Sequence, residues 1–171
     1  MSRVILLWSG GKDAMLALCH ARNAGHQVVA LATFAPPAPR FLAHPLPLVR
    51  RQAAALGLPH LLVTIEAPFE QSYETALSRL QQEWALDGVV TGDIDSVGGA
   101  PNWIRERSQP LGLTVHTPLW QQSRQALLAD MLARGIVAHL SCVDTRVLAP
   151  EWAGRVLDAA TLTELQQLAE R

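Results

Sequence analysis

Cysteine is scarce in this chain, and neither sign of charge dominates it. Cys19 and Cys142 lie far apart without a C-x-x-C pair, and Cys19 falls within the apolar part of an expected helix. Disulfide frameworks and cysteine-based metal sites are therefore disfavoured, and a reducing cytoplasm is the expected compartment. The formal net charge of -1 creates no global field that would attract nucleic acid or an anionic membrane.

Long apolar runs, internal repeats and low-complexity segments are also missing from the sequence. The apolar run near the N-terminus is too short for a signal-peptide core, and no later run approaches membrane-spanning length. The chain has 171 residues, 49% hydrophobic and 17% charged, which is typical of a compact α/β protein and excludes a disordered chain. This length predicts a single domain over residues 1–171.

A pair of glycines joins the first apolar run to the first helical pattern. Residues 4–8 are all apolar and predict a strand buried on both faces, and a helical pattern begins at Asp13. Gly10 and Gly11 allow the main chain to turn sharply and to bring its N–H groups close to a ligand. Because these groups precede a helix N-terminus and Lys12 adds a positive charge, the segment predicts a phosphate-binding loop.

This loop differs from the G-x-x-x-x-G-K-[ST] loop of common ATPases and GTPases. Leu6 occupies the position of its first glycine, and Asp13 stands where that motif has a magnesium-binding hydroxyl. A strand, glycine turn and helix without a ligand is the structural alternative. The agreement of the strand, the lysine, the acid and the N-terminal position favours phosphate binding.

Strands and helices alternate along the rest of the chain. Expected strands cover residues 27–33, 60–65, 88–92, 114–116 and 136–143, and expected helices cover residues 48–56, 72–84, 102–109, 125–134 and about 161–170. This alternation predicts a doubly wound, mostly parallel α/β sheet with right-handed crossovers.

Two segments are expected at the carboxyl edge of this sheet, where open parallel sheets bind ligands. A proline-dense loop over residues 35–47 is either a lid or pocket wall, or a mobile connector stiffened by its prolines. Gly92 ends the fourth strand and Asp93 follows it, and Asp93 is either a functional acid or a helix cap or turn former.

The sequence Ser9-Gly10-Gly11-Lys12-Asp13 resembles the PP-loop of ATP pyrophosphatases, usually written S-G-G-x-D-S. Later segments are similar to the branch of that superfamily that contains diphthine-ammonia ligase and proteins labelled adenine nucleotide alpha hydrolase-like. In chain order these segments are His44-Pro45, Gln52-Ala53, Gly57-Leu58-Pro59, Tyr73-Glu74, Gly92-Asp93-Ile94, Asn102-Trp103, Leu111-Gly112-Leu113, Pro118-Leu119-Trp120 and residues 151–158. Their order along the chain carries the resemblance.

The resemblance implies a Rossmann-like sandwich and an ATP-dependent amide ligase that joins a carboxylate to ammonia through an acyl-adenylate. It implies ATP and Mg²⁺ as cofactors, and a small-molecule carboxylate or a modified residue as the acceptor. The phosphates would be bound by the PP-loop, adenine would lie near the end of the second strand, and Asp13 would hold the metal. The nucleotide-binding candidates are Ser9, Gly10, Gly11, Lys12, Asp13, Thr33 and Phe34, and the catalytic candidates are Lys12, Asp13 and Asp93.

The acceptor side of the site is expected to come from residues from about 93 to 171. Its candidate residues are Gly92, Asp93, Trp103, Trp120 and His44. Core packing is the alternative for each tryptophan, and a structural loop histidine is the alternative for His44. Apolar positions on the last expected helix leave both a monomer and a homodimer open.

Two departures from the superfamily pattern keep other functions open. Ala14 replaces a serine or threonine of the motif, and Arg105 and Ser108 stand near positions where a glutamate and a cysteine are expected. The first alternative, favoured by Ala14, is a nucleotide-binding module with little or no turnover. The second is an enzyme that modifies transfer RNA, which the net charge and the missing pair of catalytic cysteines disfavour.

Overall fold

The computed structural model describes residues 1–96 and 102–169 and has a parallel β-sheet at its centre. The sheet holds five strands in the order β3-β2-β1-β4-β5, and every neighbouring pair is parallel. The strands are β1 (Arg3–Leu7), β2 (Gln27–Ala35), β3 (His60–Thr64), β4 (Gly88–Val90) and β5 (Thr114–His116). The predicted doubly wound sheet is therefore confirmed.

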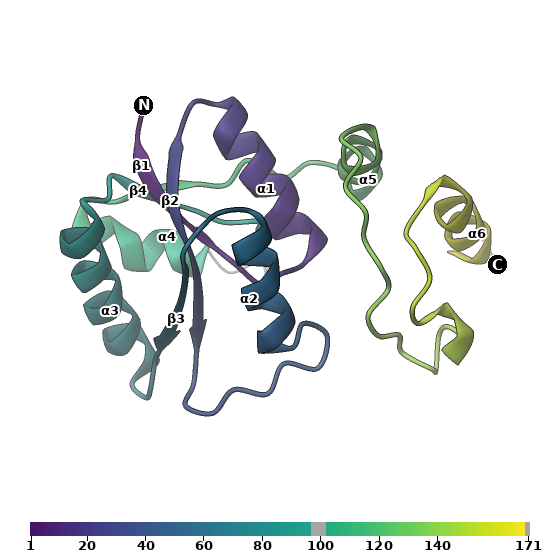
Figure 1. The fold of residues 1–171 in the computed structure, drawn as a ribbon, viewed down its shortest axis with the longest axis horizontal. Coiled ribbons are helices and arrows are strands. Elements are labelled where there is room, and N and C mark those ends of the chain that lie inside the picture. The colour runs from purple at the N-terminus through teal and green to yellow at the C-terminus, as the bar shows by residue number, and fades with distance from the viewer. Residues whose placement is uncertain (97–101, 170–171) are drawn as a thin grey trace.

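Helices cover both faces of the sheet, with α1 and α2 on one side and α3 and α4 on the other (Figure 1). Their bounds are α1 (Lys12–Asn23), α2 (Leu46–Ala55), α3 (Phe69–Trp84), α4 (Trp103–Ser108), α5 (Arg124–Ala133) and α6 (Ala159–Ala169), with short 3-10 turns η1 (Gln109–Leu111) and η2 (Pro150–Trp152). In Figure 1, α5 lies on the side of α1 that faces away from the sheet, and α6 lies still farther from the sheet.

Alternating side chains of β1 supply two separate cores. Val4 and Leu6 pack with α1, α2 and α5, whereas Ile5 packs with α3 on the opposite face. All three side chains are fully buried, and each such aliphatic residue contributes roughly 1.5–3 kcal/mol to the free energy of folding. The continuous apolar run that predicted a strand buried on both faces therefore marks the central strand of the sheet.

The strand order creates a crevice beside β1. The chain runs from β1 outward through β2 and β3, and then returns to place β4 on the other side of β1. The connections that follow β1 and β4 therefore leave the sheet in opposite directions. Ligands of open α/β sheets bind at such a switch point, outside the carboxyl ends of the strands.

The strand expected over residues 136–143 is wrong. Within the described part of the chain, this segment makes one isolated antiparallel bridge, between His139 and Val156, and joins no sheet. Its backbone pairs instead with the returning chain, as Leu140 N donates to Arg155 O. Val137 is 72% exposed. The apolar and β-branched composition favoured a strand, but composition cannot supply the neighbouring strand that a sheet requires.

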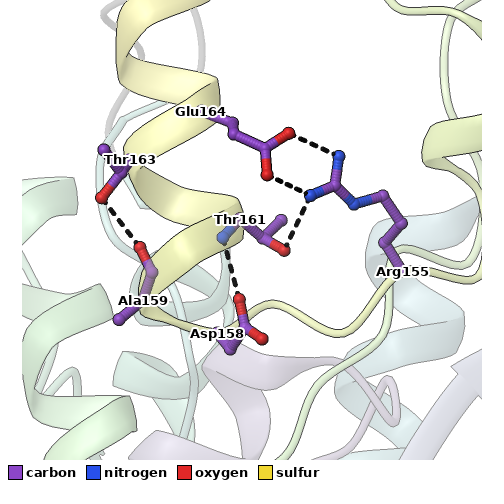
Figure 2. A network of polar contacts seen from close by, with 6 residues as sticks. All are labelled: Arg155, Asp158, Ala159, Thr161, Thr163 and Glu164. Atoms are coloured by element: carbon purple, nitrogen blue, oxygen red, sulfur yellow. Dashed lines mark hydrogen bonds and ion pairs between the residues drawn. The ribbon is translucent and has the colours of Figure 1, made fainter.

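Polar contacts fix the start of α6 (Figure 2). The two terminal guanidinium nitrogens of Arg155, Nη1 and Nη2, donate to the Glu164 carboxylate at 2.8 and 2.7 Å. The Arg155 guanidinium carbon lies 4.1 Å from the centre of the Trp152 ring. Asp158 Oδ1 accepts from Thr161 N at 2.8 Å and so caps the first turn. Trp152, Arg155 and Asp158 of the closing 151–158 segment thus form a structural junction before the last helix.

Three further expectations concern the chain outside the sheet. Leu168 on α6 is 41% exposed, so an apolar surface remains there, and the oligomeric state stays open.

Part of the loop expected before Asn102, residues 97–101, lies outside the described residues, as does Glu170 at the expected end of the last helix. No helix in the described ranges is both long and apolar enough to cross a membrane.

Candidate functional site

The loop between β1 and α1 presents an uncapped helix N-terminus. Gly11 is the N-cap residue of α1 and has no side-chain cap hydrogen bond, and Gly11 N donates to Ser9 Oγ at 3.3 Å. Gly10 has a φ of +79°, a left-handed conformation that glycine adopts without strain. The first-turn N–H groups of α1 therefore face outward from a tight turn, as an anion site requires.

Gln52 of α2 holds this loop in place through a hydrogen bond to its main chain. Its Nε2 atom donates to Gly10 O at 3.0 Å. A Cβ atom placed on Gly10 would lie 2.6 Å from Gln52 Oε1, so the side-chain amide approaches the loop as closely as it does because position 10 has no side chain. This contact fixes the carbonyl of Gly10 and leaves the loop N–H groups for a ligand.

Lys12 and Asp13 form an ion pair at the start of α1. Lys12 Nζ lies 2.8 and 2.7 Å from the two carboxylate oxygens of Asp13, and each side chain is 34% exposed. Lys12 is also the single lysine of the sequence. At this exposure the pair contributes little to stability, so both groups can exchange partners when a charged ligand arrives.

The end of β4 packs directly on the start of α1. A Cβ atom placed on Gly92 would lie 2.9 Å from Asp13 C, Asp13 O and Ala14 N. Ala14, which replaces a hydroxyl residue of the superfamily motif, is 4% exposed. Gly92 therefore brings Asp93 close to the phosphate loop by allowing contact between two main chains.

A cleft of about 810 Å³ opens at this switch point, a size suited to a nucleotide. Of the predicted site residues, it is lined by Ser9, Asp13, Thr33, Phe34, His44, Gly92, Asp93 and Trp103. The proline-dense loop contributes residues 40–44, which confirms its interpretation as a pocket wall. Candidate residues for nucleotide and for acceptor binding thus line one cavity, whereas Gly10, Gly11 and Lys12 are outside its lining.

The hydroxyl of Thr33 is committed to the fold. It donates to Trp8 O and lies 2.9 Å from His60 Nε2, so the proton on that contact must come from the imidazole. Burial and the nearby charge of Arg50 lower the pKa of His60, which agrees with a neutral ring. The Thr33 hydroxyl therefore has no proton left to donate to adenine.

His44 is placed over the phosphate loop. A Cβ atom on Gly11 would lie 3.2 Å from His44 Nε2, so the imidazole rests against the loop main chain. His44 also lines the cleft. The proline-dense loop therefore places an imidazole beside the predicted phosphate position.

Asp93 and Trp103 lie on the other wall of the cleft. Asp93 Oδ2 accepts from Asn102 Nδ2 at 2.9 Å, and Asn102 in turn caps α4 by accepting from Arg105 N at 3.0 Å. Trp103 is 38% exposed and stacks edge-on against Tyr73 at a centroid distance of 4.7 Å. Asp93 thus presents a carboxylate held by one hydrogen bond, and Trp103 presents part of its ring to solvent.

A smaller cavity of about 200 Å³ adjoins the loop on the side of α5. Lys12, Asp13 and Arg124 line it together with apolar side chains of α1 and α5. One contact fastens these two helices, because Asp130 Oδ2 of α5 lies 2.7 Å from His20 Nε2 of α1. The Oδ1 atom of Asp130 accepts from Arg134 Nε at 2.8 Å, at the end of α5. Lys12 therefore faces this cavity, whereas Asp13 borders both spaces.

Not every predicted site residue reaches the cleft, and some cleft residues were missed. Trp120 follows β5 and is half-buried away from the cleft lining, so its contact with an acceptor stays a prediction. Tyr73 and Arg40 of the cleft, and Arg124 of the smaller cavity, were not predicted as site residues. Tyr73 appeared in sequence as one apolar position of an amphipathic helix, and the arginines carry no local motif, so nothing short of the fold places them.

The carboxylates at the cleft suit a magnesium ion that is bound mainly by the phosphates of a nucleotide. Among the described residues no group of three or more histidine, cysteine, aspartate and glutamate side chains could hold a metal ion. Mg²⁺ usually binds through one or two carboxylates, waters and substrate phosphates. Asp13, which borders the cleft beside the phosphate loop, provides such a carboxylate.

Comparisons with known proteins identify relatives of this chain. The diphthamide synthase N-terminal domain matches residues 2–114 of the chain. The diphthine-ammonia ligase of Danio rerio is 29% identical over 176 aligned residues, which cover 87% of this chain and 67% of that protein. A Methanocaldococcus jannaschii structure described as a predicted subunit of tRNA methyltransferase has a TM-score of 0.56 and 19% identity, with 80% of this chain and 78% of that chain covered. This last likeness shows the fold alone.

Proposed function

Because the chain belongs to the diphthamide synthase N-terminal domain family, a branch of the PP-loop superfamily, we propose that it is an ATP-dependent amide ligase. It would adenylate a carboxylate, release pyrophosphate and transfer the acyl group to ammonia. The observation that carries the proposal is that Asp13 of the PP-loop lines the same cleft as Asp93 and Trp103. One cavity of this kind can hold a nucleotide and an acceptor together.

In the first step, a carboxylate oxygen of the acceptor bonds to the α-phosphorus of ATP as the bond to pyrophosphate breaks. The first-turn N–H groups of α1 and the Lys12 ammonium would stabilise the charge that develops on the pyrophosphate. Lys12 would leave Asp13 for the phosphates, and the freed Asp13 carboxylate would bind Mg²⁺. When bound, Mg²⁺ supplies further neutralisation of phosphate charge.

In the second step, the ammonia nitrogen bonds to the acyl carbon and AMP leaves with the electrons of the broken carbon–oxygen bond. The nitrogen loses a proton, and Asp93 is the carboxylate on the acceptor wall that would accept it. Residues from about 93 onward would form the acceptor side, with Trp103 and His44 beside the acyl group. A modified residue or a small-molecule acid would be the acceptor.

Two other functions are less well supported. An enzyme that modifies transfer RNA is not favoured by the family match, and the solved structure named for a tRNA methyltransferase supports the fold alone. A nucleotide-binding module with little turnover remains a result that the following experiment would reveal.

Product analysis tests the proposed ligase. The protein is incubated with Mg²⁺, ammonium, a small-metabolite extract and ATP labelled at the α-phosphate, and AMP is separated from ADP. AMP that depends on the extract is expected, with a loss of at least about 100-fold in D13N because charge stabilisation at the leaving group is removed. The control is D95N, which changes an exposed aspartate outside the cleft lining. ADP as the product, or equal AMP from D13N, would refute the proposal.

A further inference from the structure

Tyr73 of α3 stands at the centre of an aromatic group inside the cleft. It is 2% exposed and yet belongs to the cleft lining with Asp93. Its ring lies 4.5 Å from the Phe34 ring and 4.7 Å from the Trp103 ring, measured between centroids. Phe34 and Trp103 therefore hold Tyr73 between the predicted nucleotide end and the predicted acceptor end of the cleft.

The hydroxyl of Tyr73 is buried and makes no hydrogen bond to any described residue. Buried hydroxyl groups nearly always have a partner, because losing water without replacing its hydrogen bonds is costly. A phenylalanine would fill the same space between Phe34 and Trp103 without that cost. Since Tyr73 borders the cleft, a ligand there can supply the missing partner.

The hydroxyl has a proton available to donate. Burial, and then the negative charge of Asp93, raise the pKa of Tyr73, so the side chain keeps its proton at any physiological pH. The protonated phenol of Tyr73 and the Asp93 carboxylate therefore give the cleft a hydrogen-bond donor next to an acceptor. The donor suits an acyl or phosphoryl oxygen, whereas the carboxylate suits an N–H group.

We propose that the Tyr73 hydroxyl donates a hydrogen bond to the acyl oxygen of the acyl-adenylate and orients the acyl carbon toward ammonia. This inference rests on the proposed function. When the nitrogen bonds to the acyl carbon, the carbonyl electron pair moves onto this oxygen, and the Tyr73 hydroxyl stabilises its charge. The pair then restores the carbonyl as the bond to AMP breaks, and Asp93 takes one proton from nitrogen.

The Tyr73→Phe substitution tests this role because it removes one oxygen and keeps the ring. The ligands are AMP and acetyl-sulfamoyl adenosine, a stable analogue that retains the acyl oxygen, and calorimetry measures both dissociation constants. We expect Y73F to weaken binding of the analogue about tenfold and to change binding of AMP by less than about twofold. We also expect its melting temperature to equal or exceed that of the wild type.

Ser108→Ala is the matched control. Ser108 is fully buried with an unpartnered Oγ atom, as Tyr73 is with its hydroxyl, but it lies outside the cleft lining. S108A should keep the affinity for both ligands. Unchanged analogue binding in Y73F, or equal loss for the analogue and AMP, would overturn the role of Tyr73 alone. A wild type that binds the analogue no more tightly than AMP would overturn the proposed ligase and the inference together.

Discussion

Gly92, two residues after β4, lies against the main chain of Asp13 at the start of α1. A Cβ atom at position 92 would come within 2.9 Å of Asp13 C and O, which are backbone atoms and cannot rotate away. This contact fixes the distance between the phosphate loop and Asp93, the next residue along the chain. The phosphate loop and Asp93 are therefore held close together because position 92 is a glycine, which leaves room for the main chain of Asp13.

The Gly92→Ala substitution should disturb both the fold and the loop. We expect it to lower the free energy of unfolding by about 1–3 kcal/mol, as overpacking does in cores, and to weaken ATP binding as well. Urea unfolding and calorimetry measure the two effects. The control is G112A, where φ is +67° and a Cβ atom meets nothing within 4 Å. G112A should lose stability through strain and keep its ATP affinity. Equal ATP affinity in G92A and wild type would contradict the proposed coupling.

Gln52 should matter for nucleotide binding more than for stability. Removing its hydrogen bond to Gly10 O by Gln52→Ala is expected to cost about 0.5–1.5 kcal/mol of stability and to loosen the loop. Gln81→Ala removes a similar bond, from Gln81 Nε2 to Leu111 O at 3.1 Å, far from the loop. The two variants should lose comparable stability, measured by urea unfolding. If Q81A weakened ATP binding as much as Q52A, the bracing role of Gln52 would be wrong.

Chemical footprinting can locate ATP without any acceptor. Lys12 is the single lysine, so an amine-acetylating reagent can modify Lys12 and the N-terminal amine alone. We expect Mg²⁺-ATP to protect Lys12 and to leave modification of the N-terminal amine unchanged, because phosphates would hold the ammonium. Mass spectrometry of peptides gives both rates from one sample. Unprotected Lys12 at saturating ATP would show that the phosphates bind elsewhere.

Acid should destabilise the fold through two histidines. The pKa of His116 is lowered by burial and by the charge of His26, whose ring lies 4.2 Å away, and the pKa of His60 is lowered by burial and by Arg50. A lowered pKa means that the unfolded chain binds protons more readily, so stability is complete above the ordinary value of 6.5 and falls as the pH drops below it.

A double substitution to glutamine, H60Q with H116Q, isolates this effect. The variant should lose less unfolding free energy than the wild type between about pH 7.5 and 5.5, measured by urea unfolding at each pH. Replacing the exposed His139 by glutamine is the control and should leave the pH dependence as it is. A double variant with the same pH slope as the wild type would show that neither histidine contributes.

Local sequence signals predicted the first strand, the loop after it and the first helix well. The apolar run, the glycine pair and the helical pattern are contiguous, so the loop, its helix and the strand that precedes it follow from residues that are neighbours in sequence. Asp93 was predicted at the same edge because parallel strands end together. The same rule places Gly92 at the edge of the sheet where Asp13 lies. It does not predict that the two main chains come into direct contact.

Features that depend on distant packing were not predictable. Tyr73 is one of several apolar positions on α3, and only the approach of Phe34 and Trp103 reveals that its hydroxyl has no partner. The hydroxyl of Thr33 is occupied by Trp8 and His60, which the sequence separates from it. Residues 136–143 have the composition of a strand, but whether a strand forms depends on which chain lies beside it.

Isotope exchange between pyrophosphate and ATP tests the central claim most directly, because the first half-reaction is reversible and needs no ammonia. Labelled pyrophosphate, ATP, Mg²⁺ and a fractionated metabolite extract are incubated with wild-type protein and with D13N. The account predicts that label enters ATP with the wild type when one extract fraction is present, and that D13N abolishes the exchange. Nucleotide cleavage in the presence of that extract without any label in ATP, or equal exchange with D13N, would contradict adenylation at this loop.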